Sequence, residues 1–147
     1  MISVRRARRR VLPIAIDHPA AVTLQISVLA VALLRGLDYI ALPEGVEVKN
    51  LSQVESALGF HTWGVLFVAA AIFGLSGMWL RRWPVAVAGH GALVGIYVAF
   101  GSGALWDILL RGDTYGWRTG VGWILGGAVA HAVLAEASLD AIKRCRD

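Results

Sequence analysis

Four long runs of apolar residues, each nearly free of charge, constrain the fold of this chain more than any other feature of its sequence. A helix rises about 1.5 Å per residue and the hydrocarbon core of a bilayer is about 30 Å thick, so a spanning helix needs roughly 20 apolar residues. The runs that reach this length cover about 20–42, 58–80, 84–110 and 118–139. A soluble core would instead give its helices a polar face. The sequence therefore predicts an all-α fold, an integral membrane four-helix bundle that forms one domain over residues 1–147.

The first run is the least regular of the four, because Arg35 and Asp38 interrupt it after Leu34. It crosses a bilayer only if Arg35 extends toward water or pairs inside the bundle. The residues after Leu34 lack the small-residue pattern of a cleavage site, so we expect an uncleaved signal anchor. Between the second and third runs, two arginines precede Pro84, which a helix tolerates in its first turn, and this arrangement predicts a tight helical hairpin.

The positions of the basic residues predict that both termini face the cytoplasm, in an N-in, C-in topology of the cytoplasmic (inner) membrane, because cytoplasmic segments carry an excess of Lys and Arg. The basic residues on the inner side are then Arg5, Arg6, Arg8, Arg9, Arg10, Arg81, Arg82, Lys143, Arg144 and Arg146, and those on the outer side are Arg35, Lys49, Arg111 and Arg118. Tryptophan prefers the headgroup level. The same topology places Trp79 and Trp83 at the inner boundary and Trp63, Trp106, Trp117 and Trp123 at the outer one.

Five arginines precede the first run, and the formal net charge of the chain is +4. A basic cluster of this kind is a candidate for nucleic-acid binding. Directly before an apolar span, however, it holds the N-terminus on the cytoplasmic side and against anionic lipid. We therefore expect the lipid bilayer, and no nucleic acid, as its partner. The one cysteine, Cys145, allows neither an intramolecular disulfide nor a metal site built from cysteines.

The outer loop 43–57 is the only sizeable segment predicted outside the bilayer. Within it and just after it, an apolar face of one helix could be formed by Val46, Leu51, Val54 and Leu58. This pattern predicts a short helix that lies on the outer membrane surface, and a plain solvated loop is the alternative. The acidic residues of the loop favour a defined partner, such as another membrane protein of the cell envelope.

Small residues four positions apart recur in the last three runs. The pairs are Ala70 with Gly74, Gly91 with Gly95, Ala99 with Gly103, Gly116 with Gly120, and Gly122 with Gly126. Helices in lipid associate where small residues let their backbones approach. The pattern predicts close packing of the second to fourth spans and self-association into a homo-oligomer, and packing within one chain only is the alternative.

His90 and His131 are the candidate site inside the bilayer. By the helical rise they lie about 9 and 12 Å from the inner ends of their spans, so the two imidazoles could face each other. Two imidazoles on neighbouring helices are what a b-type haem, a bound metal ion or a proton relay would need. The alternative, which we prefer, is that each histidine hydrogen-bonds a carbonyl or hydroxyl group across a helix interface, with Glu136 as a further partner of His131. On that alternative no cofactor is expected.

A second polar cluster lies on the outer side, where six residues of the four spans fall at similar heights. They are Arg35, Asp38, His61, Asp107, Arg111 and Arg118. Asp107 and Arg111 are four residues apart and can pair on one helix face, and Arg35 can reach Asp107 or Asp38. The cluster is interpreted either as a vestibule that binds an ion, a ligand or a partner, or as a satisfied charge network at the headgroup boundary.

Motifs of catalysis and nucleotide binding are not found: there is no P-loop, His-Glu-x-x-His motif or nucleophile elbow, and the glycines at 101 and 103 lie inside a span rather than after a strand. We therefore expect that the chain is not an enzyme.

Few spans, glycine-rich helices, short loops and basic cytoplasmic ends together resemble the small polytopic membrane proteins of the holin type from phages and actinobacteria. The resemblance covers the whole chain and is one of architecture. It implies oligomerisation into a membrane lesion that releases a lytic enzyme. Two other functions fit the sequence. One is an accessory membrane protein, of the immunity or superinfection-exclusion type, that docks on an envelope partner through the outer loop. The other is a haem or proton-handling redox subunit that uses His90 and His131.

Overall fold

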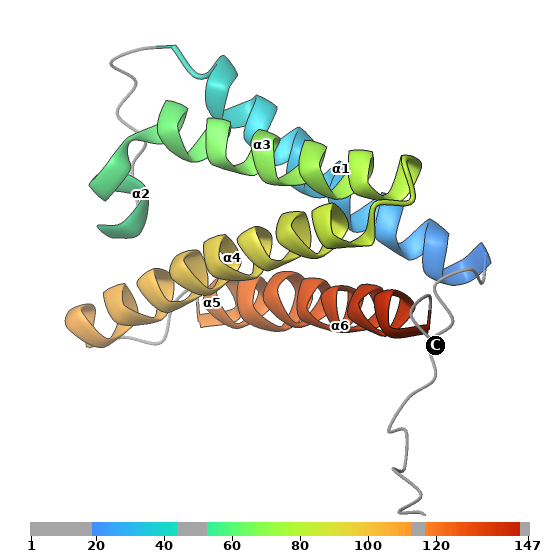
Figure 1. Cartoon of the computed structure of the whole chain (residues 1–147). Helices are drawn as coiled ribbons and strands as arrows, with labels where there is room; N and C mark the ends of the chain where they lie inside the picture. The colour runs from blue at the N-terminus through green and yellow to red at the C-terminus, as the bar shows by residue number, and fades with distance from the viewer. Residues whose placement is uncertain (1–18, 44–52, 113–116, 145–147) are drawn as a thin grey trace, which may run out of the picture.

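The computed structural model of the chain describes residues 19–43, 53–112 and 117–144 (Figure 1). Within these residues every element is helical and there is no strand, which confirms the predicted all-α fold. The elements are α1 (Pro19–Ala41), α2 (Gln53–Leu58), α3 (Phe60–Trp79), α4 (Trp83–Arg111), α5 (Trp117–Gly122), the π-helix η1 (Trp123–Ala128) and α6 (Val129–Arg144). The N-terminal arginines, Cys145, Gly116 and residues 44–52 of the outer loop lie outside the described residues.

Within the described residues, four helical segments are long and apolar enough to cross a membrane, as predicted. They are Pro19–Ala41, Phe60–Trp79, Trp83–Arg111 and the continuous segment Trp117–Arg144, which α5, η1 and α6 form together. Large apolar side chains cover the outside of these helices, and Leu34, Leu109 and Leu125 are 65%, 72% and 62% exposed. Such a surface suits lipid as its solvent. The chain therefore has the helices of a multi-pass membrane protein.

The turn between α3 and α4 is the tight hairpin that the sequence predicts. The Arg81 N–H donates to the Met78 carbonyl at 3.1 Å and the Arg82 N–H to the Gly77 carbonyl at 2.8 Å. This pair of bonds is the Schellman arrangement, which places Arg81 in the left-handed conformation with φ of 52°. Pro84 then occupies the first turn of α4, where a missing N–H costs no helical hydrogen bond.

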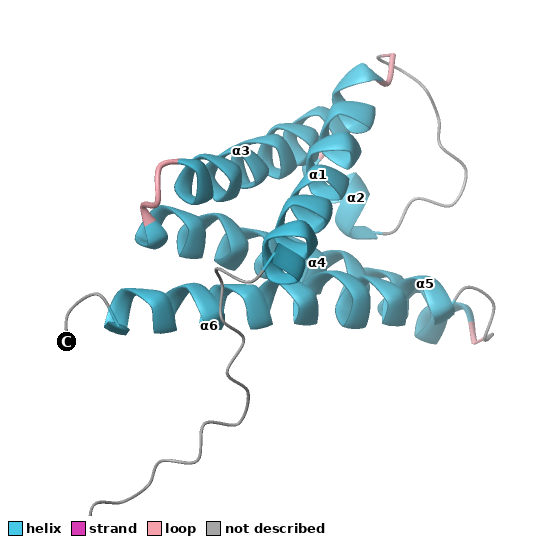
Figure 2. Cartoon of the chain, turned by 90° about the vertical axis from the view of Figure 1, so that its right-hand side faces the viewer, coloured by secondary structure: helices cyan, strands magenta, loops and turns pink. Residues whose placement is uncertain are grey.

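The helices pack in chain order, with α1 against α3, α3 against α4, and α4 against α5, η1 and α6. Figure 1 shows α1 and α3 as one pair above α4 and α6, and Figure 2 shows α1 crossing the other helices obliquely. We call the end with the start of α1, the α3–α4 turn and the end of α6 the hairpin end, and the opposite end the loop end. Because α1 contacts α6 only marginally, the seam between these two helices stays open.

Close helix contacts are made by glycines whose missing Cβ lets two backbones meet. A Cβ on Gly89 of α4 would lie 2.7 Å from the Cα of Gly74 on α3, and one on Gly36 of α1 would lie 2.8 Å from the Gly64 carbonyl oxygen on α3. Gly120 of α5 meets Gly101 of α4 in the same way. Of the predicted pairs, Ala70 with Gly74, Gly103 and Gly120 are buried.

Four other predicted packing glycines do not lie at a close helix contact. A Cβ built on Gly91, Gly95, Gly122 or Gly126 would meet nothing within 4 Å. These glycines therefore do not pack the spans of one chain against each other, because the helices are rotated so that Gly89 of α4 and Gly120 and Gly127 of the last span point inward instead.

Aromatic side chains fill the core between the middle of the bundle and the loop end. Phe67 of α3 meets Tyr97 and Phe100 of α4 edge to face, with ring centroids 5.5 and 5.7 Å apart. Such pairs contribute about 0.5–1.5 kcal/mol each beyond their buried area. Trp63, expected at the headgroup boundary, is buried against Phe100, and its Nε1–H donates to the Val54 carbonyl of α2 at 2.9 Å. This bond holds α2 against the loop end of α3.

Candidate functional site

His90 and His131 form the centre of the candidate site, and the structure brings them into direct contact. His90 of α4 is fully buried and His131 of α6 is 1% exposed. Their Nδ1 atoms are 2.8 Å apart, which is the distance of a hydrogen bond, and their ring centroids are 5.1 Å apart. The expected carbonyl, hydroxyl or Glu136 partner of His131 is therefore replaced by the second imidazole, while Glu136 is exposed on α6.

A hydrogen bond between two Nδ1 atoms holds one shared proton, because one nitrogen must donate and the other must accept. Which ring donates depends on the tautomers of the pair. A metal ion bound tetrahedrally by both nitrogens at about 2.0–2.1 Å would hold them about 3.3 Å apart, and an iron between the rings would likewise separate them beyond a hydrogen bond. Among the described residues there is also no group of three or more His, Cys, Asp or Glu side chains suited to a metal ion. The 2.8 Å separation of the two Nδ1 atoms thus suits one shared proton.

Three buried polar atoms near the hairpin end have no hydrogen-bond partner in the described part of the chain. They are the Nε2 of His90 and both side-chain polar atoms of Gln25, a residue of α1 that is fully buried. Gln25 lies one turn from Leu29, and Leu29 and Gly89 both contact Gly74 of α3. Leaving such an atom unpaired costs about 1–3 kcal/mol, so these groups do not serve stability.

A row of ring contacts leads from the histidine pair toward the loop end. Tyr97 of α4 stacks on His131 with centroids 5.4 Å apart and an interplanar angle of 17°. Trp123 of η1 lies 5.4 Å from Tyr97. The guanidinium carbon of Arg35, from α1, lies 4.2 Å above the Trp123 ring, a cation–π contact that bridges the seam between α1 and the last span. The first, third and fourth spans therefore meet in this row.

The π-helix η1 carries the residues of the last span that contact Tyr97. Glycine at position 127 faces Tyr97 so closely that a Cβ there would lie 2.5 Å from the Tyr97 ring. The extra residue in a π-helical turn changes the direction in which later side chains point, and such turns occur frequently at functional sites. In this chain η1 places Trp123 beside Tyr97 and Gly127 beneath the same ring.

A groove of about 350 Å³ opens beside Trp123. It lies between α1 and the α5–η1 segment, next to the open seam. Its lining residues are Val31, Arg35, Tyr97, Arg118, Thr119, Gly122, Trp123, Gly126 and Gly127. Two members of the predicted outer cluster, Arg35 and Arg118, thus share one groove.

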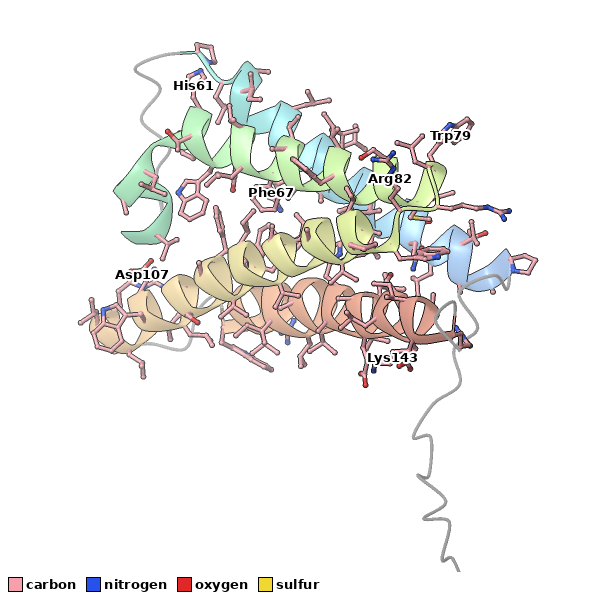
Figure 3. All side chains as sticks on the ribbon, viewed as in Figure 1. His61, Phe67, Trp79, Arg82, Asp107 and Lys143 are labelled. Carbon is pink, nitrogen blue, oxygen red and sulfur yellow. The ribbon has the colours of Figure 1, made fainter. Side chains whose placement is uncertain are left out.

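The other members of the outer cluster lie at the loop end without lining this groove. Asp38 is exposed near the end of α1 and His61 is exposed in the first turn of α3, whereas Asp107 is half-buried on α4. Arg111 is exposed at the end of α4. Figure 3 shows His61 and Asp107 at the loop end, with Arg82 and Lys143 at the hairpin end. The outer loop, on which the predicted envelope partner depends, lies largely outside the described residues.

Three residues of the site were not singled out from the sequence as site residues. Gln25 has only a weak signal in the sequence. An uncharged amide within an apolar run is unusual only if it is buried, and the sequence alone does not show that it is. Tyr97 and Trp123 have none, because aromatic residues in a span more often fill the core or the headgroup boundary. Comparisons of the chain with protein-family models, with curated proteins and with solved structures gave no match.

Proposed function

We propose that this protein is a proton-handling membrane protein in which His90 and His131 act as one proton-sharing unit inside the bilayer. The observation that carries the proposal is the 2.8 Å separation of two buried Nδ1 atoms. Imidazole is the side chain that ordinarily changes its charge near neutral pH. Ionisable groups that face the interior of a membrane bundle mark proton relays and ion pathways.

The surroundings of the pair favour proton exchange from the hairpin end. His90 lies seven residues after Trp83, so it is about 10 Å from the start of α4 by the helical rise. The amide of Gln25 can both donate and accept a hydrogen bond, and its polar atoms and the His90 Nε2 are unpaired within the described residues. Toward the loop end, the pair is followed by aromatic rings and the positive charge of Arg35, which opposes an entering proton.

Proton flux into liposomes tests the proposal directly. The purified protein is placed in liposomes that contain a pH-sensitive dye, and a potassium diffusion potential set with valinomycin drives protons inward. We expect faster acidification than in protein-free liposomes. The His90→Asn and His131→Asn variants should lower the rate at least about tenfold, because each removes a proton-transfer group.

His61→Asn is the matched control, because His61 is exposed on α3 and remote in sequence and depth from the pair. It should keep the wild-type rate. Thermal unfolding in detergent separates loss of proton transfer from loss of fold. A wild-type rate equal to that of protein-free liposomes contradicts the proposal, and so does a folded His131→Asn variant that conducts normally.

A second candidate function is self-association of the holin-like kind, in which several chains assemble and permeabilise the membrane. Its specific observation is the outward direction of Gly91, Gly95, Gly122 and Gly126, which leaves two bare backbone strips on the outside of the bundle. The strip on α4 borders an apolar groove of about 610 Å³ between α3 and α4. In lipid, close backbone approach is a main source of helix association.

The mass of the protein in a mild detergent tests this second candidate. Gly91→Leu and Gly122→Leu should shift an oligomer toward the monomer, because each fills a strip that a neighbouring helix would need. Ala132→Leu, at an exposed position of α6 outside both strips, is the control. Unchanged mass for both glycine variants removes the self-association argument. Release of a trapped dye larger than a proton distinguishes a lesion from proton handling.

A further inference from the structure

The groove between α1 and the α5–η1 segment differs in chemistry from the rest of the bundle, and it offers a binding site beyond the His90–His131 pair. Two arginines line it, together with Thr119 and aromatic rings, and none of its described lining residues is acidic. A concentration of positive charge beside apolar helix surface indicates a site for an anion rather than for an apolar molecule.

Arg35 is held in this groove in an unusual way. It lies six residues before the end of α1, about 9 Å inside the span by the helical rise. Its guanidinium group rests 4.2 Å above Trp123 and 5.7 Å from the Tyr39 ring. Among the described residues no ion pair joins it to a carboxylate, and Asp38, one turn away on the same helix, is exposed. A charge kept within a span without a carboxylate partner among the described residues points to a ligand that supplies the negative charge.

The shape of the groove matches a ligand that joins an anionic group to an apolar chain. Arg118, in the first turn of α5, lies nearer the loop end than Arg35 does, so the two arginines form its charged part. The glycines at 122 and 126 form a floor of bare backbone, where a Cβ would meet nothing within 4 Å. Val31 of α1, which is 60% exposed, forms the facing wall. Because α1 and α6 contact each other only marginally, this part of the groove opens at the seam.

We propose that this groove binds a phosphate group carried by a membrane lipid, with Arg35 and Arg118 on the phosphate oxygens and an acyl chain over Gly122 and Gly126. The planar guanidinium group matches phosphate in a two-point hydrogen-bonded geometry. Trp123 fixes the plane of the Arg35 guanidinium group through the cation–π contact. A free phosphate ion offers the same oxygens without the acyl chain, so the test must separate the two sources.

Lipid retention measures the proposed binding. The full chain is purified in mixed micelles that contain equal amounts of phosphatidylglycerol and phosphatidylcholine, and the retained lipids are quantified by mass spectrometry. We expect phosphatidylglycerol to be enriched over phosphatidylcholine. Arg35→Gln and Arg118→Gln should each lower that enrichment about tenfold, which is the effect of losing one charge-assisted contact. Arg144→Gln, which changes an exposed arginine at the hairpin end, should leave it unchanged.

Two further variants keep the test decisive if Arg35→Gln does not fold. Arg35→Lys keeps the positive charge but loses the planar guanidinium group that can bind two phosphate oxygens at once, so it should retain an intermediate amount of phosphatidylglycerol. Gly126→Leu keeps both arginines and fills the floor, so it should reduce retention of the lipid without changing any charge. Thermal unfolding of each variant shows that the fold is intact.

Inorganic phosphate separates the two sources of the anion when it is added to protein in the mixed micelles, where displacement of phosphatidylglycerol is measured, and to protein in phosphatidylcholine micelles, where stabilisation is measured. If it displaces no phosphatidylglycerol and does not stabilise the wild-type protein, the lipid is the ligand. If it stabilises the wild-type protein as strongly as phosphatidylglycerol does, and Gly126→Leu has no effect, the assignment to lipid is overturned. Equal retention of phosphatidylglycerol by the wild type, Arg35→Gln and Arg118→Gln overturns the site itself. None of these measurements depends on proton flux.

Discussion

Replacing Gly89 by alanine should destabilise the protein strongly, whereas the same replacement at Gly91, on the same helix, should not. A Cβ at residue 89 would lie 2.7 Å from the Gly74 Cα and 2.8 Å from the Ala70 carbonyl oxygen. Carbon atoms in ordinary contact are about 3.5–4.0 Å apart. Both partners belong to the backbone of α3 and cannot rotate away, so α3 and α4 must separate by about 1 Å to admit the methyl group.

The cost follows from what this separation disturbs. Flanking contacts, such as that of Gly77 with Ala86, are equally close and would open together with it. A gap of about 0.5–1 Å loses a quarter to a half of the attraction in each atom pair, and overpacking of a core costs about 1–3 kcal/mol. Gly91→Ala is the matched control two residues away, where a Cβ meets nothing within 4 Å. It should be neutral, or stabilising by up to about 1 kcal/mol through helix propensity.

The measurement is reversible unfolding in mixed micelles of a mild detergent and dodecyl sulfate, followed by helical circular dichroism. We expect Gly89→Ala to lower the free energy of unfolding by about 2–3 kcal/mol relative to Gly91→Ala. Equal stability of the two variants would refute the packing of α3 on α4 at Gly89 and Gly74, and with it the register of the hairpin.

Two further predictions concern the candidate site. A double-mutant cycle of His90→Asn and His131→Asn should give a coupling energy of about 0.5–3 kcal/mol, because the two rings share one buried hydrogen bond. The coupling is measured from the free energies of unfolding of the variants. A coupling of zero would contradict the hydrogen bond. Gly127→Ala should cost about 1–3 kcal/mol, since its Cβ would meet the Tyr97 ring, whereas Gly126→Ala next to it should cost little. Equal melting temperatures of these two variants would contradict the close contact of Gly127 with Tyr97.

The four long helices and the matching positions of His90 and His131 along them could be predicted because both depend on features counted along one helix. Length and hydropathy identify a span without reference to its neighbours, and all four predicted spans are present as helices. The helical rise likewise places His90 and His131 at similar depths. That they face each other depends additionally on how α4 and α6 are rotated, so the sequence alone left a carbonyl or hydroxyl partner open.

Rotation about the helix axis is also the reason that the glycine pairs were hard to assign. A spacing of four residues places two glycines on one face but does not say whether that face points inward or outward. On α4 the inward face carries Gly89, and Gly91 and Gly95 lie on the outside. In the last span Trp123 and Gly127 are also four residues apart and share one face, but this spacing does not say that the face meets Tyr97 of α4.

The residues that hold the bundle together are different from those that carry the proposed chemistry. The first set makes close backbone contacts, whereas the second set contains buried side-chain atoms that lack a hydrogen-bond partner in the described chain. Lipid gives helices no hydrophobic reason to associate, so Gly36, Gly74 and Gly89 act through close backbone contact. Gln25 and His90 instead bring buried polar atoms without partners in the described chain, which lowers stability. An apolar side chain such as leucine at either position would avoid that cost. Their burial is therefore better explained by the proposed proton exchange at the imidazole pair than by packing.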